Sequence, residues 1–173
     1  MAIEINTKVS MGETFGKKIG NLVLEDAKFF GRPNFSGELD RFNDDRRKFT
    51  VLIPNEIADQ LREMGWNVKT SIPTEEEVTE GRETLSHLKV MVDMSDDPGK
   101  GADVWVIQGE DREKLTTSTV AILDRSRLEA MDLELRAWEY NPDEHPGQYS
   151  ARLVTLVATL RPNILDQKYG RLH

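Results

Sequence analysis

The chain of 173 residues contains no cysteine. This absence excludes disulfide bonds, catalysis by a thiol, and zinc or iron–sulfur centres that are held by cysteine. The sequence also lacks any run of about 18 apolar residues, the length that a membrane-spanning helix requires. Its first 18 residues have no apolar centre of the kind that marks a secretory signal. We therefore expect a cytoplasmic protein without a membrane partner.

Positive charge is scarce, and the formal net charge is −8 at pH 7. This balance argues against a protein that coats duplex DNA nonspecifically. The charge is uneven, however: residues 1–50 hold nine Lys or Arg against eight Asp or Glu, and residues 51–173 hold fourteen against twenty-three. Because the local field along a groove decides the attraction, an acidic body remains compatible with nucleic-acid binding.

Aromatic residues make up only 7% of the chain, yet two of them share the polar face of one predicted strand, residues 131–140. Side chains alternate along a strand, so its odd-numbered apolar residues point into a core while Arg136, Trp138 and Tyr140 point the other way. Aromatic rings beside a guanidinium suit the stacking of unpaired bases, worth about 1–3 kcal/mol per base. The alternative is a second hydrophobic layer, covered by a loop or a partner.

Two further clusters combine cations with aromatic rings. The first lies before and within a predicted strand at 46–53 and is diluted by two aspartates, and its members are Arg41, Phe42, Arg46, Arg47 and Lys48. The second is Tyr149 with Arg152, on a strand that we expect beside residues 131–140. Cations provide affinity and salt dependence through phosphates, and rings stack on bases. A solvated hairpin edge is the alternative for the first cluster. Strand alternation places Arg47 on its core side, without a clear role.

The other aromatic residues are mostly predicted to lie in the core. Trp66 shares a strand face with Val68, and Phe29, Phe30 and Phe49 fall in apolar segments. For Trp105 the pattern supports core and surface equally.

The chain as a whole has the pattern of a mainly β protein. Strands are predicted at 19–30, 46–53, 66–70, 84–94, 102–108, 131–140 and 149–160. A short helix is expected at 55–65, and a short helix or turn at 117–123. Residues 1–17 are predicted to form a flexible arm, and 73–83 a mobile acidic loop. Since the strands do not alternate with long helices, the pattern favours one OB-fold-like Greek-key barrel over residues 18–173.

Motifs for catalysis are missing. The PGKG segment at 98–101 lacks the glycine spacing and the Ser or Thr of a phosphate-binding loop. The three histidines stand alone rather than in metal-binding pairs, and there is no G-x-S-x-G elbow. We therefore expect no enzyme, no metal and no cofactor. Two alternatives stay open: an acidic protein-interaction module anchored by Trp138 and Tyr140, and a metal-dependent nuclease.

Several short motifs follow one another in a distinctive order. They are NFSG at 34–37, RFN before a basic strand, an F-x-V-x-I strand, GWNVK at 65–69, a Leu-Asp pair before the 131–140 strand, and SARLVTLVATL. Over about residues 27–70 and 103–170, the chain resembles the single-stranded-DNA-binding proteins of tailed bacteriophages. The resemblance implies an OB fold that binds single-stranded DNA with little sequence preference, in phage replication or recombination within the host cytoplasm. Replication or recombination proteins and a second copy of the chain are further expected partners.

Overall fold

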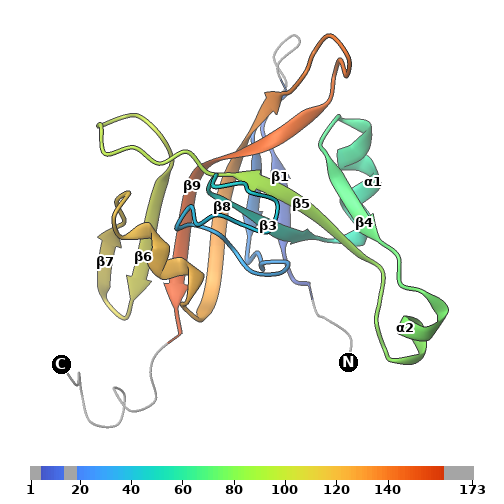
Figure 1. The fold of residues 1–173 in the computed structure, drawn as a ribbon, viewed down its shortest axis with the longest axis horizontal. Coiled ribbons are helices and arrows are strands. Elements are labelled where there is room, and N and C mark those ends of the chain that lie inside the picture. Colours follow the sequence, from blue (N-terminus) through green and yellow to red (C-terminus); the bar gives the residue numbers. More distant parts are fainter. Residues whose placement is uncertain (1–4, 14–18, 162–173) are drawn as a thin grey trace.

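The computed structural model describes residues 5–13 and 19–161, and these form nine strands and two short α-helices (Figure 1). The strands are β1 (Lys8–Met11), β2 (Leu22–Glu25), β3 (Lys48–Ile53), β4 (Val68–Ser71), β5 (Leu85–Met91), β6 (Asp103–Gln108), β7 (Asp111–Lys114), β8 (Leu128–Glu139) and β9 (Tyr149–Leu160). The helices are α1 (Asn55–Glu63) and α2 (Glu75–Thr79), and a 3₁₀ helix, η1, spans Val120–Asp124.

All nine strands belong to one curved sheet whose main path runs β1-β2-β8-β9-β5-β3. Strand β4 pairs with β5, and β6 connects β9 to β7. The path stays open between β1 and β3, but residues 28–30, which follow β2, bridge part of the gap. There Phe30 N donates to Thr50 O at 2.8 Å, and Leu52 N donates to Lys28 O at 2.9 Å. The result is the mainly β, OB-like architecture that the sequence predicts.

The centre of the sheet is the antiparallel pair of β8 and β9, each twelve residues long. Strand β9 runs antiparallel to β8 on one side and parallel to β5 and β6 on the other. Its apolar character on both faces therefore fits a central strand, as expected. The register of the β8–β9 pair shifts between Glu134 and Leu135, which is where the two strands carry a bulge.

One continuous hydrophobic core fills the inner face of the sheet. It contains an aromatic group in which Phe49 lies 5.4 Å from Phe29 and 5.2 Å from Phe35, between ring centroids. Trp66 is 2% exposed, so the prediction that it lies in the core is confirmed. Phe30 differs from the prediction, because it is only half-buried and faces away from this aromatic group.

The junction between α1 and β4 is fixed by a close approach of two chain segments. Gly65 has a φ of +106°, and a Cβ added there would lie 2.1 Å from the carbonyl oxygen of Gly147. Only glycine accepts both the left-handed conformation and this contact. The helix therefore ends where the sequence predicts, and its end touches the chain that leads into β9.

Three segments depart from the sequence expectations. Residues 8–11, which we placed in a flexible arm, form β1 and pair with β2. Strand β7 was not predicted, because its four residues are charged and exposed and only pairing with β6 defines them. The acidic loop contains α2, which Thr74 begins by a reciprocal capping box with Glu77.

No helix among the described residues is long and apolar enough to cross a membrane.

Candidate nucleic-acid interface

Strand β8 has the two faces that its sequence predicts. Met131, Leu133 and Leu135 are at most 3% exposed on the inner face. On the outer face Arg136 is exposed and Trp138 keeps 46% of its surface in solvent. A tryptophan that projects from the outer face near the end of a central strand in this way offers a flat apolar surface to a ligand.

An open groove of about 560 Å³ lies over this outer face, and we call it the tryptophan groove. Strands β8, β9 and β5 and the segment before β3 contribute its walls. Its lining residues are Asp45, Arg46, Arg47, Asn67, Lys89, Met91, Val92, Asp93, Met94, Trp138, Tyr140, Ser150 and Arg152. Four residues predicted from three separate sequence clusters thus come together: Arg46, Trp138, Tyr140 and Arg152.

Arg152 holds the indole of Trp138 in place. Its guanidinium carbon lies 4.2 Å from the indole centroid, a cation–π contact. The same guanidinium donates through Nη1 to Asp93 Oδ2 at 2.5 Å, while its buried Nε has no hydrogen-bond partner among the described residues. The arginine is therefore anchored to the segment that follows β5, and it fixes the plane of the indole on β8.

Arg136 and Arg152 lie directly opposite each other on β8 and β9. Like charges in this position destabilise a strand pair unless an opposite charge comes between them. Arg152 has Asp93 as a partner, whereas Arg136 forms no hydrogen bond or ion pair with any residue that the structure describes. The pair is thus a favourable place for an anion such as a phosphate.

Tyr140 follows the last residue of β8 and lies at the end of the tryptophan groove. Its hydroxyl donates to Gln148 Oε1 at 3.2 Å, and its ring centroid is 6.1 Å from that of His145. Both neighbours belong to the connection between β8 and β9, so that connection positions the ring.

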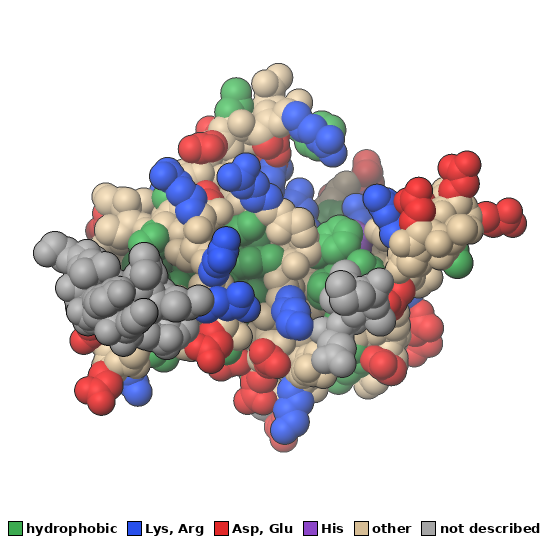
Figure 2. Space-filling model, turned by 90° about the horizontal axis from the view of Figure 1, so that it is seen from below, with side chains coloured by type: hydrophobic (Ala, Val, Ile, Leu, Met, Phe, Trp, Pro, Cys, Tyr) green, Lys and Arg blue, Asp and Glu red, His purple; other side chains and the backbone are tan. Residues whose placement is uncertain are grey.

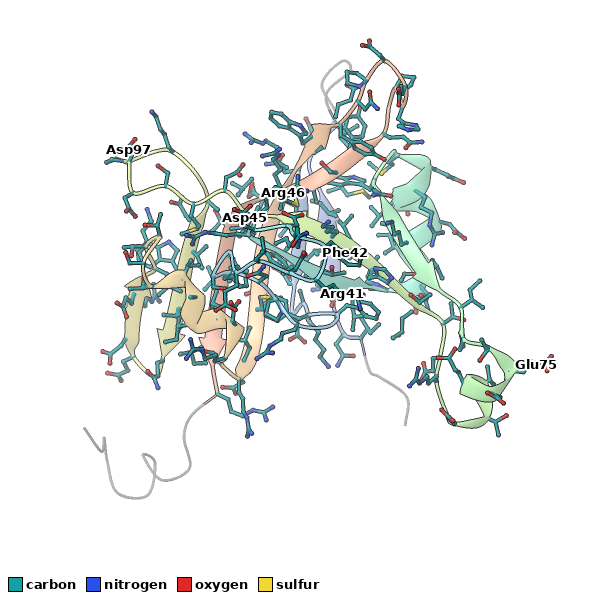
Figure 3. All side chains as sticks on the ribbon, viewed as in Figure 1. Arg41, Phe42, Asp45, Arg46, Glu75 and Asp97 are labelled. Atoms are coloured by element: carbon teal, nitrogen blue, oxygen red, sulfur yellow. The ribbon has the colours of Figure 1, made fainter. Side chains whose placement is uncertain are left out.

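The segment before β3 presents Arg41 and Phe42 at its tip (Figure 3). Phe42 is 74% exposed, and the Arg41 guanidinium carbon lies 4.8 Å from its ring centroid. An exposed phenylalanine is costly to hydrate, so this tip is a second candidate surface for a base.

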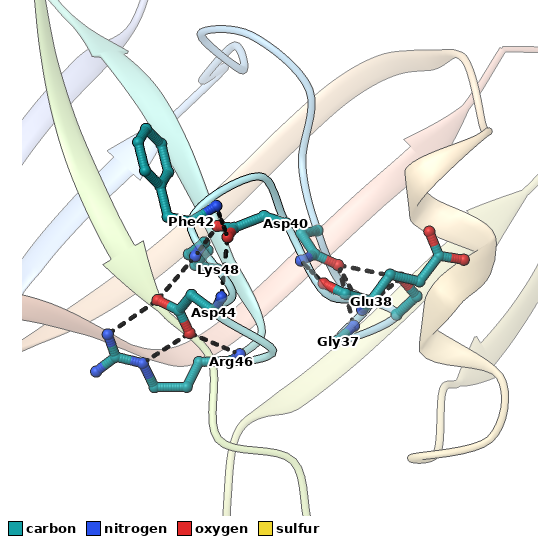
Figure 4. Close-up of polar contacts among 9 residues, drawn as sticks. Gly37, Glu38, Asp40, Phe42, Asp44, Arg46 and Lys48 are labelled. Atoms are coloured by element: carbon teal, nitrogen blue, oxygen red, sulfur yellow. Dashed lines mark hydrogen bonds and ion pairs between the residues drawn. The ribbon is translucent and has the colours of Figure 1, made fainter.

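Two carboxylates organise the base of this segment (Figure 4). Lys48 Nζ lies 2.6 Å from Asp40 Oδ2 and 2.9 Å from Asp44 Oδ2, and Asp44 also accepts from Arg46 at 2.9 Å. The hydrogen bond from Arg46, followed by that from Lys48, lowers the pKa of Asp44 strongly. Although burial opposes it, hydrogen bonding to the two carboxylates raises the pKa of Lys48. The segment is therefore a compact charged turn.

This network bears on the predicted role of Lys48. The side chain is 16% exposed and its charge is matched by two carboxylates, whereas Arg46 is 67% exposed and lines the tryptophan groove. Arg47 instead donates to the carbonyl oxygens of Phe35 and Thr117, at 3.2 and 3.3 Å, which ties the segment to the chain before η1. Contact between Lys48 and DNA stays a prediction that this placement does not favour.

Tyr149 also lies apart from the groove lining. Strand alternation turns it to the face opposite Arg152, and a Cβ on Gly65 would lie 2.8 Å from its ring. Its backbone N–H donates to Gly65 O at 2.8 Å. Tyr149 therefore joins β9 to the end of α1, and its role in DNA binding stays a prediction.

Sequence reasoning missed Lys89, which lies on the outer face of β5 and lines the tryptophan groove. Burial, followed by repulsion from Lys48, lowers the pKa of Lys89, and it forms no ion pair with a described residue. Alternation against Leu88 and Val90 indicated that it points outward. Its place in the same groove as Trp138 depends on the β5–β9 pairing, which no local pattern contains.

Positive charge also gathers elsewhere on the surface. Figure 2 shows the underside of the molecule, where Lys and Arg side chains surround apolar ones and most Asp and Glu lie toward the margins. The net charge of −8 is therefore unevenly distributed over the surface as well as along the chain.

Two of the short sequence motifs meet in space. The Asp124 carboxylate accepts from Phe35 N at 2.6 Å and from Ser36 N at 3.1 Å, so the Leu-Asp pair holds the NFSG turn. Asn34 Oδ1 closes that turn by accepting from Gly37 N at 3.0 Å. These motifs are structural, and they support the segment that carries Arg41 and Phe42.

Comparison with known families matches residues 11–173 to a putative phage single-stranded-DNA-binding domain. The chain belongs to this family. Two solved structures have a similar fold, and each similarity covers 90% of the present chain and 97% of the chain in the solved structure. They are the single-stranded DNA-binding protein from bacteriophage Enc34 in complex with ssDNA (TM-score 0.52, 11% identity) and its C-terminal truncation (TM-score 0.50, 13% identity). No curated protein sequence matches the chain.

Proposed function

We propose that this family member binds single-stranded DNA with little sequence preference, and that the tryptophan groove is where the strand lies. The observation that carries the proposal is the exposed indole of Trp138, held by Arg152 within 4.2 Å and lined up with further cations. Stacking on an indole accepts any base, because every base has a π-face.

In this proposal, different residues contact different parts of the DNA strand. Trp138 and Tyr140 provide rings for bases, while Arg46 and Lys89 attract the sugar-phosphate backbone. Arg136 is outside the groove lining but lies opposite Arg152, and it attracts the backbone from beside the groove. Arg152 both orients the indole and adds charge. The exposed tip of Arg41 and Phe42 extends this surface beyond the groove. Such a division gives affinity that falls with salt and does not depend on sequence.

The wider role follows from the family. We propose a binding protein without catalytic activity or cofactor, which serves phage DNA replication or recombination in the host cytoplasm. Proteins of those processes and a second copy of the chain are its proposed protein partners.

The test is a gel shift with labelled oligo-dT and with duplex of equal length, each with and without Mg²⁺, at several salt concentrations. We expect oligo-dT to shift without shortening, duplex to shift less, and affinity to fall as salt rises. Absence of any shift favours a protein-interaction module instead, and a shortened product favours a nuclease.

A further inference from the structure

The outer face of β5 continues beyond the tryptophan groove to a second aromatic surface. Met91 and Lys89 line the groove, and the next residue with the same orientation is His87. The imidazole of His87 stacks on the ring of Phe30, with centroids 4.4 Å apart and planes at 3°. Both side chains are half-buried, so each retains surface in solvent.

Three separate elements hold this ring pair. Phe30 lies in the segment that bridges β2 to β3, where its N–H donates to Thr50 O at 2.8 Å. His87 lies on β5, and its Nε2 is 3.1 Å from the hydroxyl of Ser71 at the end of β4. The preceding Phe29 points into the aromatic core, which fixes the direction of Phe30. The two rings are therefore placed before any ligand arrives.

The surroundings of the pair are positively charged. Lys69 lies directly opposite His87 on β4, and Lys89 lies two residues along β5. Burial, followed by repulsion from Lys69, lowers the pKa of His87, so its imidazole is neutral at pH 7. A neutral ring flanked by ammonium groups matches a base with its phosphates.

The Phe30–His87 pair also lies on a path across the sheet that starts at Trp138 in the tryptophan groove. Trp138 pairs with Ser150, and the parallel β5–β9 register pairs Val90, the residue after Lys89, with Ala151, the residue after Ser150. Two strand spacings, about 10 Å, separate Trp138 from Lys89, and two residues of β5, about 7 Å, separate Lys89 from His87. We propose that the Phe30–His87 pair is a second base-stacking platform, and that a single strand bound at Trp138 crosses Lys89 to reach it. This inference rests on the function proposed above.

The test compares wild type, His87→Ala and His87→Phe on labelled oligo-dT of about 4 to 16 nucleotides, the range of site sizes for OB folds. We expect His87→Ala to bind the longest oligonucleotides about 5- to 150-fold more weakly, and to bind the shortest ones as wild type does. His87→Phe keeps a ring and should restore the affinity. Trp105→Ala removes an exposed indole elsewhere on the sheet and serves as the control.

A second measurement separates stacking from backbone contacts. Long oligo-dT that carries abasic residues should bind wild type and His87→Ala with nearly equal affinity, because neither can stack where no base exists. If His87→Ala binds every length as wild type does while Trp138→Ala is weakened, the second platform is wrong and the proposed function stands. If His87→Ala loses the same affinity for oligonucleotides of every length and its melting temperature falls, the ring pair is purely structural, and the second platform is again wrong. If wild type binds no single strand, the proposed function itself fails.

Discussion

Replacement of Trp138 by alanine tests the central step of the proposed binding mode. The indole is 46% exposed and contacts the Arg152 guanidinium, which keeps its bond to Asp93 after the substitution. Loss of one stacked base removes about 1–3 kcal/mol of binding energy. That range corresponds to a dissociation constant raised about 5- to 150-fold.

The same substitution should cost little stability. Loss of the cation–π contact removes about 0.5–1 kcal/mol at an exposed site, which lowers the melting temperature by only about 1–4 °C in a protein of this size. Trp66→Ala provides the contrast, because Trp66 is 2% exposed in the core. It should lose about 3–5 kcal/mol of folding free energy.

The assay is a fluorescence titration with oligo-dT, alongside a thermal melt of each variant. Wild type should show quenching of its tryptophan emission on binding, and Trp138→Ala should lose most of that quenching. The mechanism is refuted if Trp138→Ala binds oligo-dT as tightly as wild type. A large fall in melting temperature would instead identify Trp138 as a structural residue.

Three further predictions concern charge and backbone. Arg46→Ala and Lys89→Ala should each reduce the slope of log affinity against log salt concentration by about one. Unchanged slopes in salt titrations would show that the sugar-phosphate backbone of the DNA lies away from these two residues. The pKa values of the carboxylates around Lys48 are lowered, so their pairing stabilises the fold above about pH 4 and the stabilisation is lost as the pH falls further. Melts of Lys48→Met should therefore show a deficit in melting temperature at pH 7 that begins to shrink below about pH 4 and keeps shrinking as the pH approaches the depressed pKa values. A deficit of the same size at pH 7 and at about pH 2 contradicts the ion-pair origin. Gly65→Ala should lower the free energy of unfolding by more than about 1 kcal/mol in denaturant titrations, because φ is +106° there and the new Cβ would lie 2.1 Å from Gly147 O. An unfolding free energy equal to that of wild type would show that the turn can shift.

The sequence alone determined the features that depend on local alternation. The two faces of β8 follow from the period of two that any strand has, so Trp138 could be placed outside the core without knowledge of its neighbours. Helix α1 and its end at Gly65 follow similarly from helical spacing and from a residue that tolerates positive φ. The family resemblance rested on short motifs and their order along the chain, and the family match over residues 11–173 confirms it.

Tertiary structure alone decided which of the candidate residues share a surface. Lys48 and Arg46 are two residues apart, yet one is enclosed by two carboxylates and the other lines the groove. Local alternation indicates that Lys89 and His87 point outward, but not that Lys89 shares a groove with Trp138 or that His87 stacks on Phe30, because those positions come from pairing between segments far apart in sequence. Pairing with the adjacent strand β6 also created β7 from four charged residues, since its backbone hydrogen bonds to β6 need no apolar side chains. A sequence pattern records which way a side chain points, but not what lies across from it.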